Sequence, residues 1–196
     1  MQIRRYLQVL GLAIPLFAAS AFGRFSVTSL NTWSPSGRPG SSPDYYIHAN
    51  ITDPDPTKDV SDADGAQVYC ALAWQWPDIP YNQILDCEIS DARGSVSWAW
   101  SIELLKATDA ENPSPTTNFY LHWRAINTSQ PQDEDVIVYS GIGHFEVGEN
   151  MQGTCAASGF CSWALKQAEI PVLIDITTEK CSGTFDEALH GLNCSE

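Results

Sequence analysis

The sequence predicts an all-β fold, an antiparallel β-sandwich or β-barrel with disulfides and at most one or two short helices. Apolar and polar residues alternate with a period of two through most of the chain, and helical periodicity is scarce. About eight short runs of this kind follow one another at roughly even spacing, with turns between them. Six cysteines can cross-link such sheets.

The expected strands are short alternating segments that end at turn residues. Residues 25–33 end at SPSGRPGSSP, and residues 44–52 end at a DPDP run. The segment AQVYCALAW leads into a stretch enclosed by two cysteines. Further strands are expected at residues 94–105, 118–126, 136–147 and 171–178.

Two segments near the C-terminus are the expected helices. CSWALKQAEI, residues 161–170, is the better candidate and would form about two turns, and residues 185–194 could form another. The chain shows no internal repeat and no linker between domains. We therefore expect residues 24–196 to form a single β-rich domain.

The first 23 residues read as a secretory signal peptide. Arg4 and Arg5 supply a charged start, and an apolar run of about 13 residues follows, shorter than the roughly 20 needed to cross a bilayer. Small residues then offer cleavage after Ala21 or after Gly23. The sequence therefore predicts a secreted, extracellular protein.

The charge of the chain argues against two classes of partner. Removal of Arg4 and Arg5 leaves 8 basic against 24 acidic side chains, a formal charge of −16. Such a surface repels nucleic acid and anionic lipid, because it can neutralise neither. We expect no nucleic-acid or membrane partner.

The cysteines and sequons agree with the secretory route. An even count of six cysteines predicts three disulfides, and the sequence leaves open which of 15 pairings forms. These cysteines are Cys70, Cys87, Cys155, Cys161, Cys181 and Cys194. Three N-x-S/T motifs predict glycosylation at Asn50, Asn127 and Asn193.

No metal, cofactor or catalytic site is predicted. The acidic run at residues 53–65 fails the register of an EF-hand loop, because Val60 and Ala71 fall at ligand positions. His48, His122, His144 and His190 are far apart and lack metal-binding spacing. There is no G-x-S-x-G elbow and no spare thiol. Carboxylates such as Glu103, Asp135, Glu146 and Asp175 are too numerous to single out a hydrolytic pair.

The candidate binding residues come from the segment between Cys70 and Cys87. A bridge between these two cysteines would enclose a stapled hairpin or strand connection, with a rigid turn at Pro77 and Pro80. We take Trp74, Trp76, Ile79 and Tyr81 as the hypothetical ligand surface. Trp98 and Trp100 instead share a face with Ile102 and Leu104, which is typical of a core.

The cysteine and strand pattern resembles a fungal family. The elements are Cys70 and Cys87, then SVSWAWSIELL, then CAASGFCSWAL leading into PVLIDIT. They resemble the secreted AA1-like proteins, the family of the Alternaria major allergen, across most of the mature chain. The resemblance implies a compact disulfide-bonded β-sandwich or β-barrel without established catalytic residues.

The same resemblance implies the disulfide pairs. Cys70 would pair with Cys87 and Cys155 with Cys161, which leaves Cys181 with Cys194 as an additional bridge. The type member forms a covalent dimer through an earlier cysteine, and no cysteine precedes Cys70 here. We therefore expect a monomer or a non-covalent dimer.

The expected function is non-catalytic binding outside the cell. Because several AA1-like proteins are allergens, elicitors or effectors, the resemblance implies a secreted effector-like protein that binds a host extracellular protein. The tryptophans keep a second class open, a carbohydrate-binding module for cell-wall glycan. A glycan hydrolase with a carboxylate pair is the third alternative.

Overall fold

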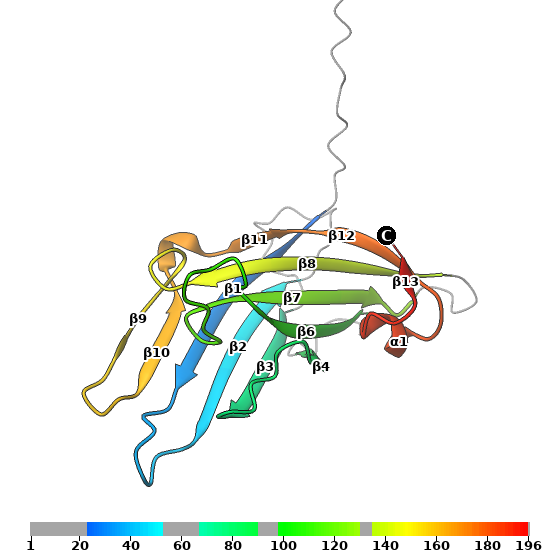
Figure 1. The fold of residues 1–196 in the computed structure, drawn as a ribbon. Helices are drawn as coiled ribbons and strands as arrows, with labels where there is room; N and C mark the ends of the chain where they lie inside the picture. The colour runs from blue at the N-terminus through cyan, green and yellow to red at the C-terminus, as the bar shows by residue number, and fades with distance from the viewer. Residues whose placement is uncertain (1–22, 53–66, 90–97, 130–134, 196) are drawn as a thin grey trace, which may run out of the picture.

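The fold is a two-sheet antiparallel β structure, as expected. The computed structural model describes residues 23–52, 67–89, 98–129 and 135–195. The signal segment before residue 23, the acidic run at residues 53–65 and Val96 lie outside the described residues. Figure 1 shows strands of one sheet running across those of the other.

Among the described residues, sheet A has seven strands, and it presents one face to the core. Its hydrogen-bonded order is β5-β3-β2-β1-β10-β9, and β11 pairs with the other half of β1. Its strands are β1 (Arg24–Ser34), β2 (Asp44–Thr52), β3 (Gln67–Gln75), β5 (Glu88–Ile89), β9 (Met151–Cys155), β10 (Cys161–Leu165) and β11 (Val172–Asp175).

Sheet B has six strands in the order β13-β12-β8-β7-β6-β4. Its strands are β4 (Ile84–Asp86), β6 (Trp98–Lys106), β7 (Asn118–Asn127), β8 (Val136–Glu146), β12 (Thr177–Cys181) and β13 (Cys194–Ser195). The expected strand at residues 171–178 is therefore divided between β11 in sheet A and β12 in sheet B.

The chain passes between the sheets at both lateral edges. It crosses at Cys87, between β4 and β5, and again at Ile176, between β11 and β12. At the second crossing β8 carries Gly141 and Gly143. A Cβ at Gly143 would lie 2.6 Å from the Ile174 side chain, so glycine allows β11 to pack closely there.

The core follows directly from strand alternation. Along β3 the burial pattern alternates, with Val68, Cys70, Leu72 and Trp74 buried and the residues between them more exposed. Sheet B contributes residues such as Trp123, which is fully buried. A smaller second cluster lies under the short C-terminal helix on the outer face of sheet B.

Three disulfides hold the sheets and connections together. They join Cys70 to Cys87, Cys155 to Cys161 and Cys181 to Cys194. These are the pairs that the family resemblance implied. Each joins neighbouring strands or a strand to a crossing, so the bridges stabilise the folded pairing by restricting the unfolded chain.

The prediction of a helix at residues 161–170 is wrong. Cys161–Leu165 forms strand β10, and only a single 3₁₀ turn, η1 (Gln167–Glu169), follows it. The segment pairs with β9 on one side and with β1 on the other, and the Cys155–Cys161 bridge fixes its start. These tertiary contacts outweigh a weak local preference for helix.

The second expected helix is present as α1 (Phe185–Leu189). Thr184 caps its first turn. The Thr184 side chain accepts a hydrogen bond from the Glu187 amide, and the Glu187 carboxylate accepts one from the Thr184 amide. This capping box explains why so short a helix forms.

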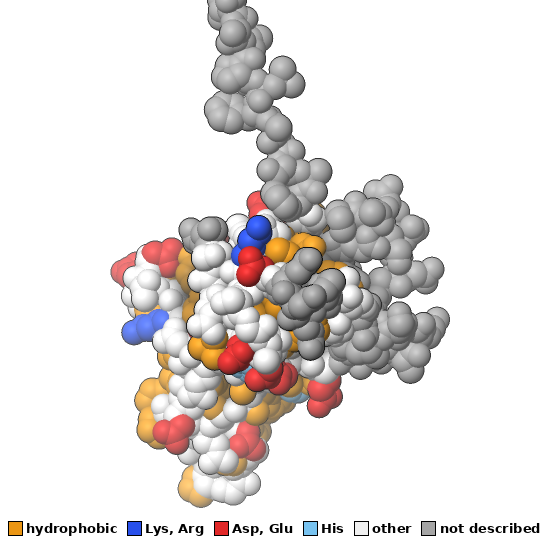
Figure 2. Space-filling view, turned by 90° about the vertical axis from the view of Figure 1, so that its right-hand side faces the viewer, with side chains coloured by type: hydrophobic (Ala, Val, Ile, Leu, Met, Phe, Trp, Pro, Cys, Tyr) orange, Lys and Arg blue, Asp and Glu red, His pale blue; other side chains and the backbone are white. Residues whose placement is uncertain are grey.

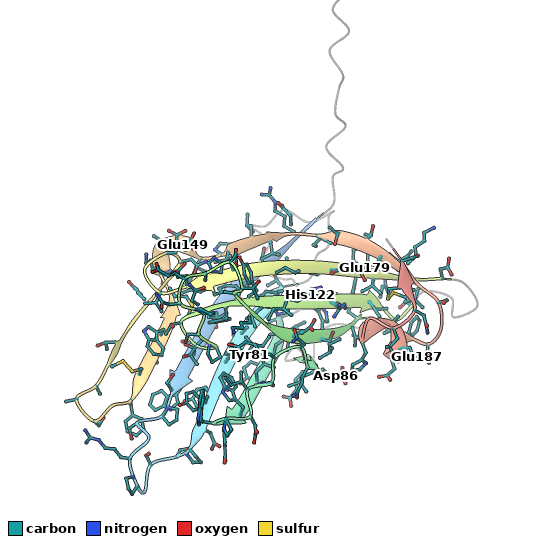
Figure 3. The ribbon with its side chains drawn as sticks, viewed as in Figure 1. Tyr81, Asp86, His122, Glu149, Glu179 and Glu187 are labelled. Atoms are coloured by element: carbon teal, nitrogen blue, oxygen red, sulfur yellow. A yellow bond between two sulfur atoms is a disulfide. The ribbon has the colours of Figure 1, made fainter. Side chains whose placement is uncertain are left out.

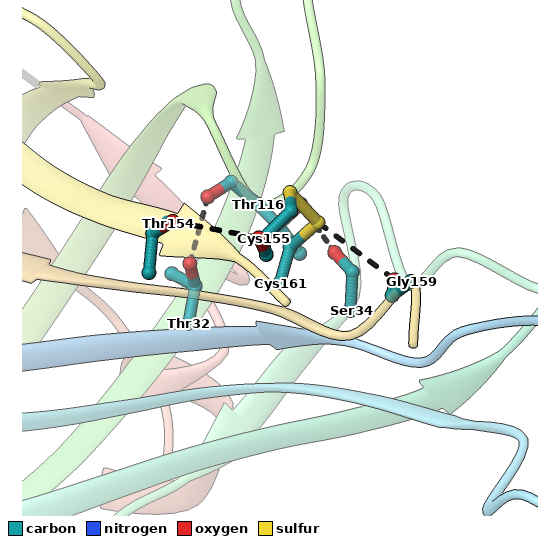
Figure 4. The surroundings of a disulfide bond; sticks show 7 residues. All are labelled: Thr32, Ser34, Thr116, Thr154, Cys155, Gly159 and Cys161. Atoms are coloured by element: carbon teal, nitrogen blue, oxygen red, sulfur yellow. Dashed lines mark hydrogen bonds between the residues drawn. A yellow bond between two sulfur atoms is a disulfide. The ribbon is translucent and has the colours of Figure 1, made fainter. Parts of the chain in front are cut away.

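The β9–β10 hairpin extends sheet A beyond sheet B, as the lower left of Figure 1 shows. The β6–β7 connection contacts the end of β1, which is the strand that pairs with β10 of this hairpin. The Thr32 hydroxyl donates to the Thr116 carbonyl at 2.7 Å, and the Ser34 and Thr116 hydroxyls are 3.0 Å apart (Figure 4). The end of β1 is therefore fixed in place, which positions the surface described next.

Candidate ligand-binding face

The structure separates the four predicted binding residues. Trp74 is 6% exposed and stacks on Tyr45, with ring centroids 5.7 Å apart. It cannot contact a partner, because strand alternation turns it into the core with Leu72 and Cys70. The prediction that Trp74 belongs to a ligand surface is therefore wrong.

Trp76 lies past the end of β3 and is 70% exposed. Ile79 and Tyr81 are half-buried and pack against the core, and burial raises the pKa of the Tyr81 hydroxyl. The turn is well ordered, since the Asn82 amide donates to the Leu104 carbonyl at 2.9 Å. Of the predicted group, Trp76 alone offers a large exposed apolar surface.

The structure reveals a different group of aromatic side chains, which we call the aromatic face. It consists of Phe160, Trp33, Tyr46, His48 and Tyr69, on the outer side of sheet A. All five are half-buried, whereas their strand neighbours Thr32 and Ile47 are buried on the inner side.

The rings of the aromatic face form an unbroken series of contacts. Trp33 and Tyr46 are opposite one another in register, with parallel planes and centroids 5.9 Å apart. Tyr46 stacks on His48 at 4.7 Å, and His48 meets Tyr69 at 5.5 Å. Phe160 extends the series from the hairpin, 5.2 Å from Trp33. Such aromatic contacts restrict the rotamers of the rings.

Small or uncharged side chains surround the rings. In one row across the strands, Trp33 and Tyr46 lie between Ser162 and Ala73; in the next, Asn31 and His48 lie between Ala164 and Ala71. Acidic groups occur only at the margins of the described face, with Asp44 at the start of β2 and Glu88 on the edge strand β5. The side chains that surround the rings are therefore small or uncharged.

His48 is suited to an uncharged surface. Partial burial lowers its pKa below the ordinary 6.5, because desolvation disfavours the imidazolium form. At neutral pH the ring is thus predominantly uncharged, and it keeps its stacking contact with Tyr46 without adding charge.

The predicted glycosylation sites lie in three different settings. Asn50 is half-buried on the outer side of β2, opposite Tyr69, and its Nδ2 donates to the Ser29 hydroxyl at 3.3 Å. Asn127 ends β7, and its Oδ1 accepts from the Ser129 amide. Asn193 is exposed in a left-handed turn beside the Cys181–Cys194 bridge.

Two groups of described residues have metal-ligand chemistry. Glu179 lies beside Cys181 and Cys194, but both sulfurs are in a disulfide and offer no thiolate. His144, Glu146 and Glu149 have ligand atoms within 4.8 Å of one another. The Glu149 side chain is 63% exposed, so these charges are solvated at the end of a strand.

A shallow pocket of about 530 Å³ lies at the end of sheet B, beneath the inner side of the protruding hairpin. Its lining residues are Ala110, Glu111, Asn112, Thr117, Asn118, Glu146, Val147 and Trp163. The two carboxylates give it an acidic rim, unlike the uncharged aromatic face.

Sequence reasoning missed the aromatic face because its members come from four separate segments. Trp33, Tyr46 and Tyr69 each lie in a strand with an alternating pattern. The pattern shows only on which side of its own strand each residue lies. The strand order and register bring them together, and neither can be read from local pattern. The available signal was the presence of aromatic residues at positions expected to face solvent.

No family model, curated protein or solved structure matches the chain. Within the described residues, no helix is long and apolar enough to span a membrane.

Proposed function

We propose that this is a secreted protein that binds a neutral cell-wall polysaccharide through the aromatic face. The observation that carries the proposal is the series of five partly exposed aromatic rings on one sheet surface. Pyranose rings have apolar faces that pack on aromatic side chains, and their hydroxyls bond to amides and hydroxyls nearby. Asn31, Ser162 and Thr154 supply such groups in the same rows.

Charge supports a neutral ligand. The chain carries a formal charge of −14, and acidic side chains are scattered over the side of the molecule seen in Figure 2. An anionic polymer would be repelled by this surface. A neutral glycan meets no such penalty, and the uncharged centre of the aromatic face avoids burying a charge.

Secretion belongs to the same proposal. The signal-peptide pattern of the first 23 residues and the three disulfides together support an oxidising route to the cell exterior. The resemblance to the AA1-like proteins supports an extracellular role in fungi.

A second candidate is binding to a host extracellular protein through Trp76. It is favoured by the 70% exposure of that side chain on a turn held by neighbouring hydrogen bonds. A rigid, exposed tryptophan is a typical anchor of protein interfaces. The effector reading of the family resemblance points in the same direction.

One pull-down experiment separates the two candidates. The oxidised protein is offered cellulose, chitin and plant apoplastic fluid, together with the variants Tyr46→Ala and Trp76→Ala. Retention on a polysaccharide that is lost in Tyr46→Ala supports the aromatic face. Capture of a defined host protein that is lost only in Trp76→Ala supports the second candidate instead.

The matched control is Tyr120→Ala. Tyr120 is also a half-buried tyrosine on the outer side of a strand, and its ring contacts that of His144 with centroids 4.6 Å apart, but it belongs to sheet B. Equal loss of retention in Tyr46→Ala and Tyr120→Ala would indicate general damage and would count against the aromatic face.

A further inference from the structure

Sheet B carries a serine, a histidine and a glutamate in a hydrogen-bonded chain. Glu103 on β6 lies directly opposite His122 on β7, and Ser140 stands on the next strand, β8. The His122 Nδ1 is 3.1 Å from Glu103 Oε2, and the His122 Nε2 is 2.7 Å from Ser140 Oγ. Figure 3 shows His122 in the middle of the sheet.

The chemistry of the partners fixes the direction of these hydrogen bonds. A carboxylate oxygen can only accept, and Arg124 Nη1 also donates to this Glu103 oxygen, at 3.4 Å. Nδ1 of His122 must therefore donate to Glu103. Nε2 is left as the acceptor of the Ser140 hydroxyl proton, which is the arrangement of a base poised beside a nucleophile.

The surroundings of His122 disfavour its protonated form. Its pKa lies below the ordinary 6.5, mainly through burial and then through the nearby Arg124 charge, although the Glu103 contact opposes both. Glu179, across the strand pair from Val138, is the other charged group that acts on the ring.

Arg124 also supplies an unused donor. It lies directly opposite Ser140 in the β7–β8 register, and its Nε is buried and bonds to no described residue. The turn after α1 covers the guanidinium at Gly191, where a Cβ would lie 3.2 Å from Arg124 Nη2. In hydrolytic sites, a fixed N–H close to the nucleophile stabilises the negative charge that develops on a carbonyl oxygen.

We propose that Ser140, His122 and Glu103 form a hydrolytic site for small carboxylic esters, with acetyl esters as the substrate class. Ser140 Oγ attacks the ester carbonyl carbon while His122 Nε2 takes the hydroxyl proton. His122 gives this proton to the leaving alcohol oxygen as the C–O bond breaks, which leaves an acyl-serine. Water then attacks the acyl carbon while His122 Nε2 takes one of its protons, and His122 gives that proton to Ser140 Oγ as the acyl–serine C–O bond breaks and the carboxylic acid departs.

The roles of the remaining residues follow from the geometry. Glu103 is a positioning residue, since its carboxylate bonds to His122 and to Arg124. We assign the donor to the oxyanion to Arg124, because it lies opposite Ser140 in register and its Nε bonds to no described residue. The limited exposure of Ser140 and His122, 4% and 8%, restricts the site to small acyl groups.

The test combines a fluorophosphonate probe with hydrolysis of p-nitrophenyl acetate by the oxidised full chain. We expect the probe to label Ser140, identified by peptide mapping. Ser140→Ala and His122→Gln should lose labelling and at least about a hundredfold in hydrolysis. Ser101→Ala is the matched control, because Ser101 is a buried serine on β6 whose hydroxyl bonds to the Leu189 carbonyl at 3.1 Å. It should keep both activities.

Two results would overturn the proposal. One is a folded wild-type protein that neither reacts with the probe nor hydrolyses the ester; the other is equal labelling of Ser140→Ala, with folding checked by circular dichroism. Glu103→Gln tests positioning, because loss of its charge should lower the rate and move the acidic limb of the pH profile to lower pH. This site lies on the sheet opposite the aromatic face, so either proposal can fail without the other.

Discussion

Trp74 and Trp76 lie two residues apart, yet only one of them is available to a partner. β3 ends at Gln75, so alternation still applies to Trp74 and turns it into the core, whereas Trp76 follows the strand and projects into solvent. The cis peptide bond between Trp76 and Pro77 begins the turn that carries it. A double substitution of both tryptophans would therefore combine a folding defect with a surface change.

We predict that the two single variants differ in stability. Trp74→Ala should lose about 3–5 kcal/mol of unfolding free energy, because it removes a buried indole and leaves a cavity. Trp76→Ala should change it by no more than about 0.5 kcal/mol, as expected for an exposed position. Urea unfolding at pH 7 measures both, and comparable losses in the two variants would contradict the assignment of Trp74 to the core.

Two histidines, one buried and one half-buried, predict how the stability of the fold depends on pH. His48 and His122 both have a lowered pKa in the folded protein, so the unfolded chain binds more protons below about pH 7. The stability that these two histidines contribute is complete above pH 6.5, and it is lost as the pH falls through their pKa in the folded protein. Asp109 and Glu187 also have a lowered pKa, but they change the stability only below about pH 4.5. They therefore do not affect its pH dependence near the histidine range.

We therefore expect the unfolding free energy to decrease between pH 7 and pH 5, measured by urea titration at each pH. His122→Gln should show a shallower decrease, since its contribution to the proton difference is gone. The same pH dependence in wild type and variant would show that burial of His122 does not control this window.

At the scale of elements, strand alternation could be read from the sequence, but strand pairing could not. Residues 44–52 and 118–126 were expected as strands and form β2 and β7. The β9 strand was missed, and residues 161–165 were expected to be helical, because both depend on a hairpin closed by Cys155 and Cys161. A five-residue segment has little periodicity of its own, so its partner decides its structure.

The candidate sites show the same limit. Two tryptophans just before a proline turn predict an exposed aromatic surface, and Trp76 is exposed. The local pattern is silent about His122 and gives no reason to place it between Glu103 and Ser140, which are 19 and 18 residues away along the chain. Register across three strands creates that contact, as it creates the aromatic face.

The disulfides should differ in their effect on stability. The enclosed segments span 17 residues for Cys70–Cys87 and 6 for Cys155–Cys161. By the chain-entropy relation, their loss should cost roughly 3 and 2 kcal/mol, respectively. Paired Cys→Ser variants, compared by urea unfolding, should follow this order. A larger loss on removing Cys155–Cys161 would show that the protruding hairpin stabilises the whole sheet.

At the scale of the whole molecule, charge and shape divide the surface into distinct regions. Sheet A carries an uncharged aromatic face, the end of sheet B carries an acidic pocket, and the centre of sheet B carries the Ser140–His122–Glu103 chain. Because the two sheets turn their outer sides away from each other, the aromatic face and the Ser140–His122–Glu103 chain lie on opposite sides of the molecule. Ligand binding and ester hydrolysis can thus be tested separately.

The proposal of secretion makes a prediction about the mature protein. Expression in a fungal host should release a chain that begins at Phe22 or Arg24, with glycans on one or more of Asn50, Asn127 and Asn193. Intact-mass analysis before and after enzymatic deglycosylation measures both features. An intracellular product that retains Met1 would contradict the proposal.

The most direct test of the central claim is a binding isotherm of the purified protein on insoluble cellulose and chitin, compared with Tyr46→Ala and Tyr120→Ala. The account predicts saturable binding to a neutral polysaccharide, weakened about tenfold or more by Tyr46→Ala and unchanged by Tyr120→Ala. Absence of binding to either polymer, or equal weakening by the two variants, would contradict a role for the aromatic face.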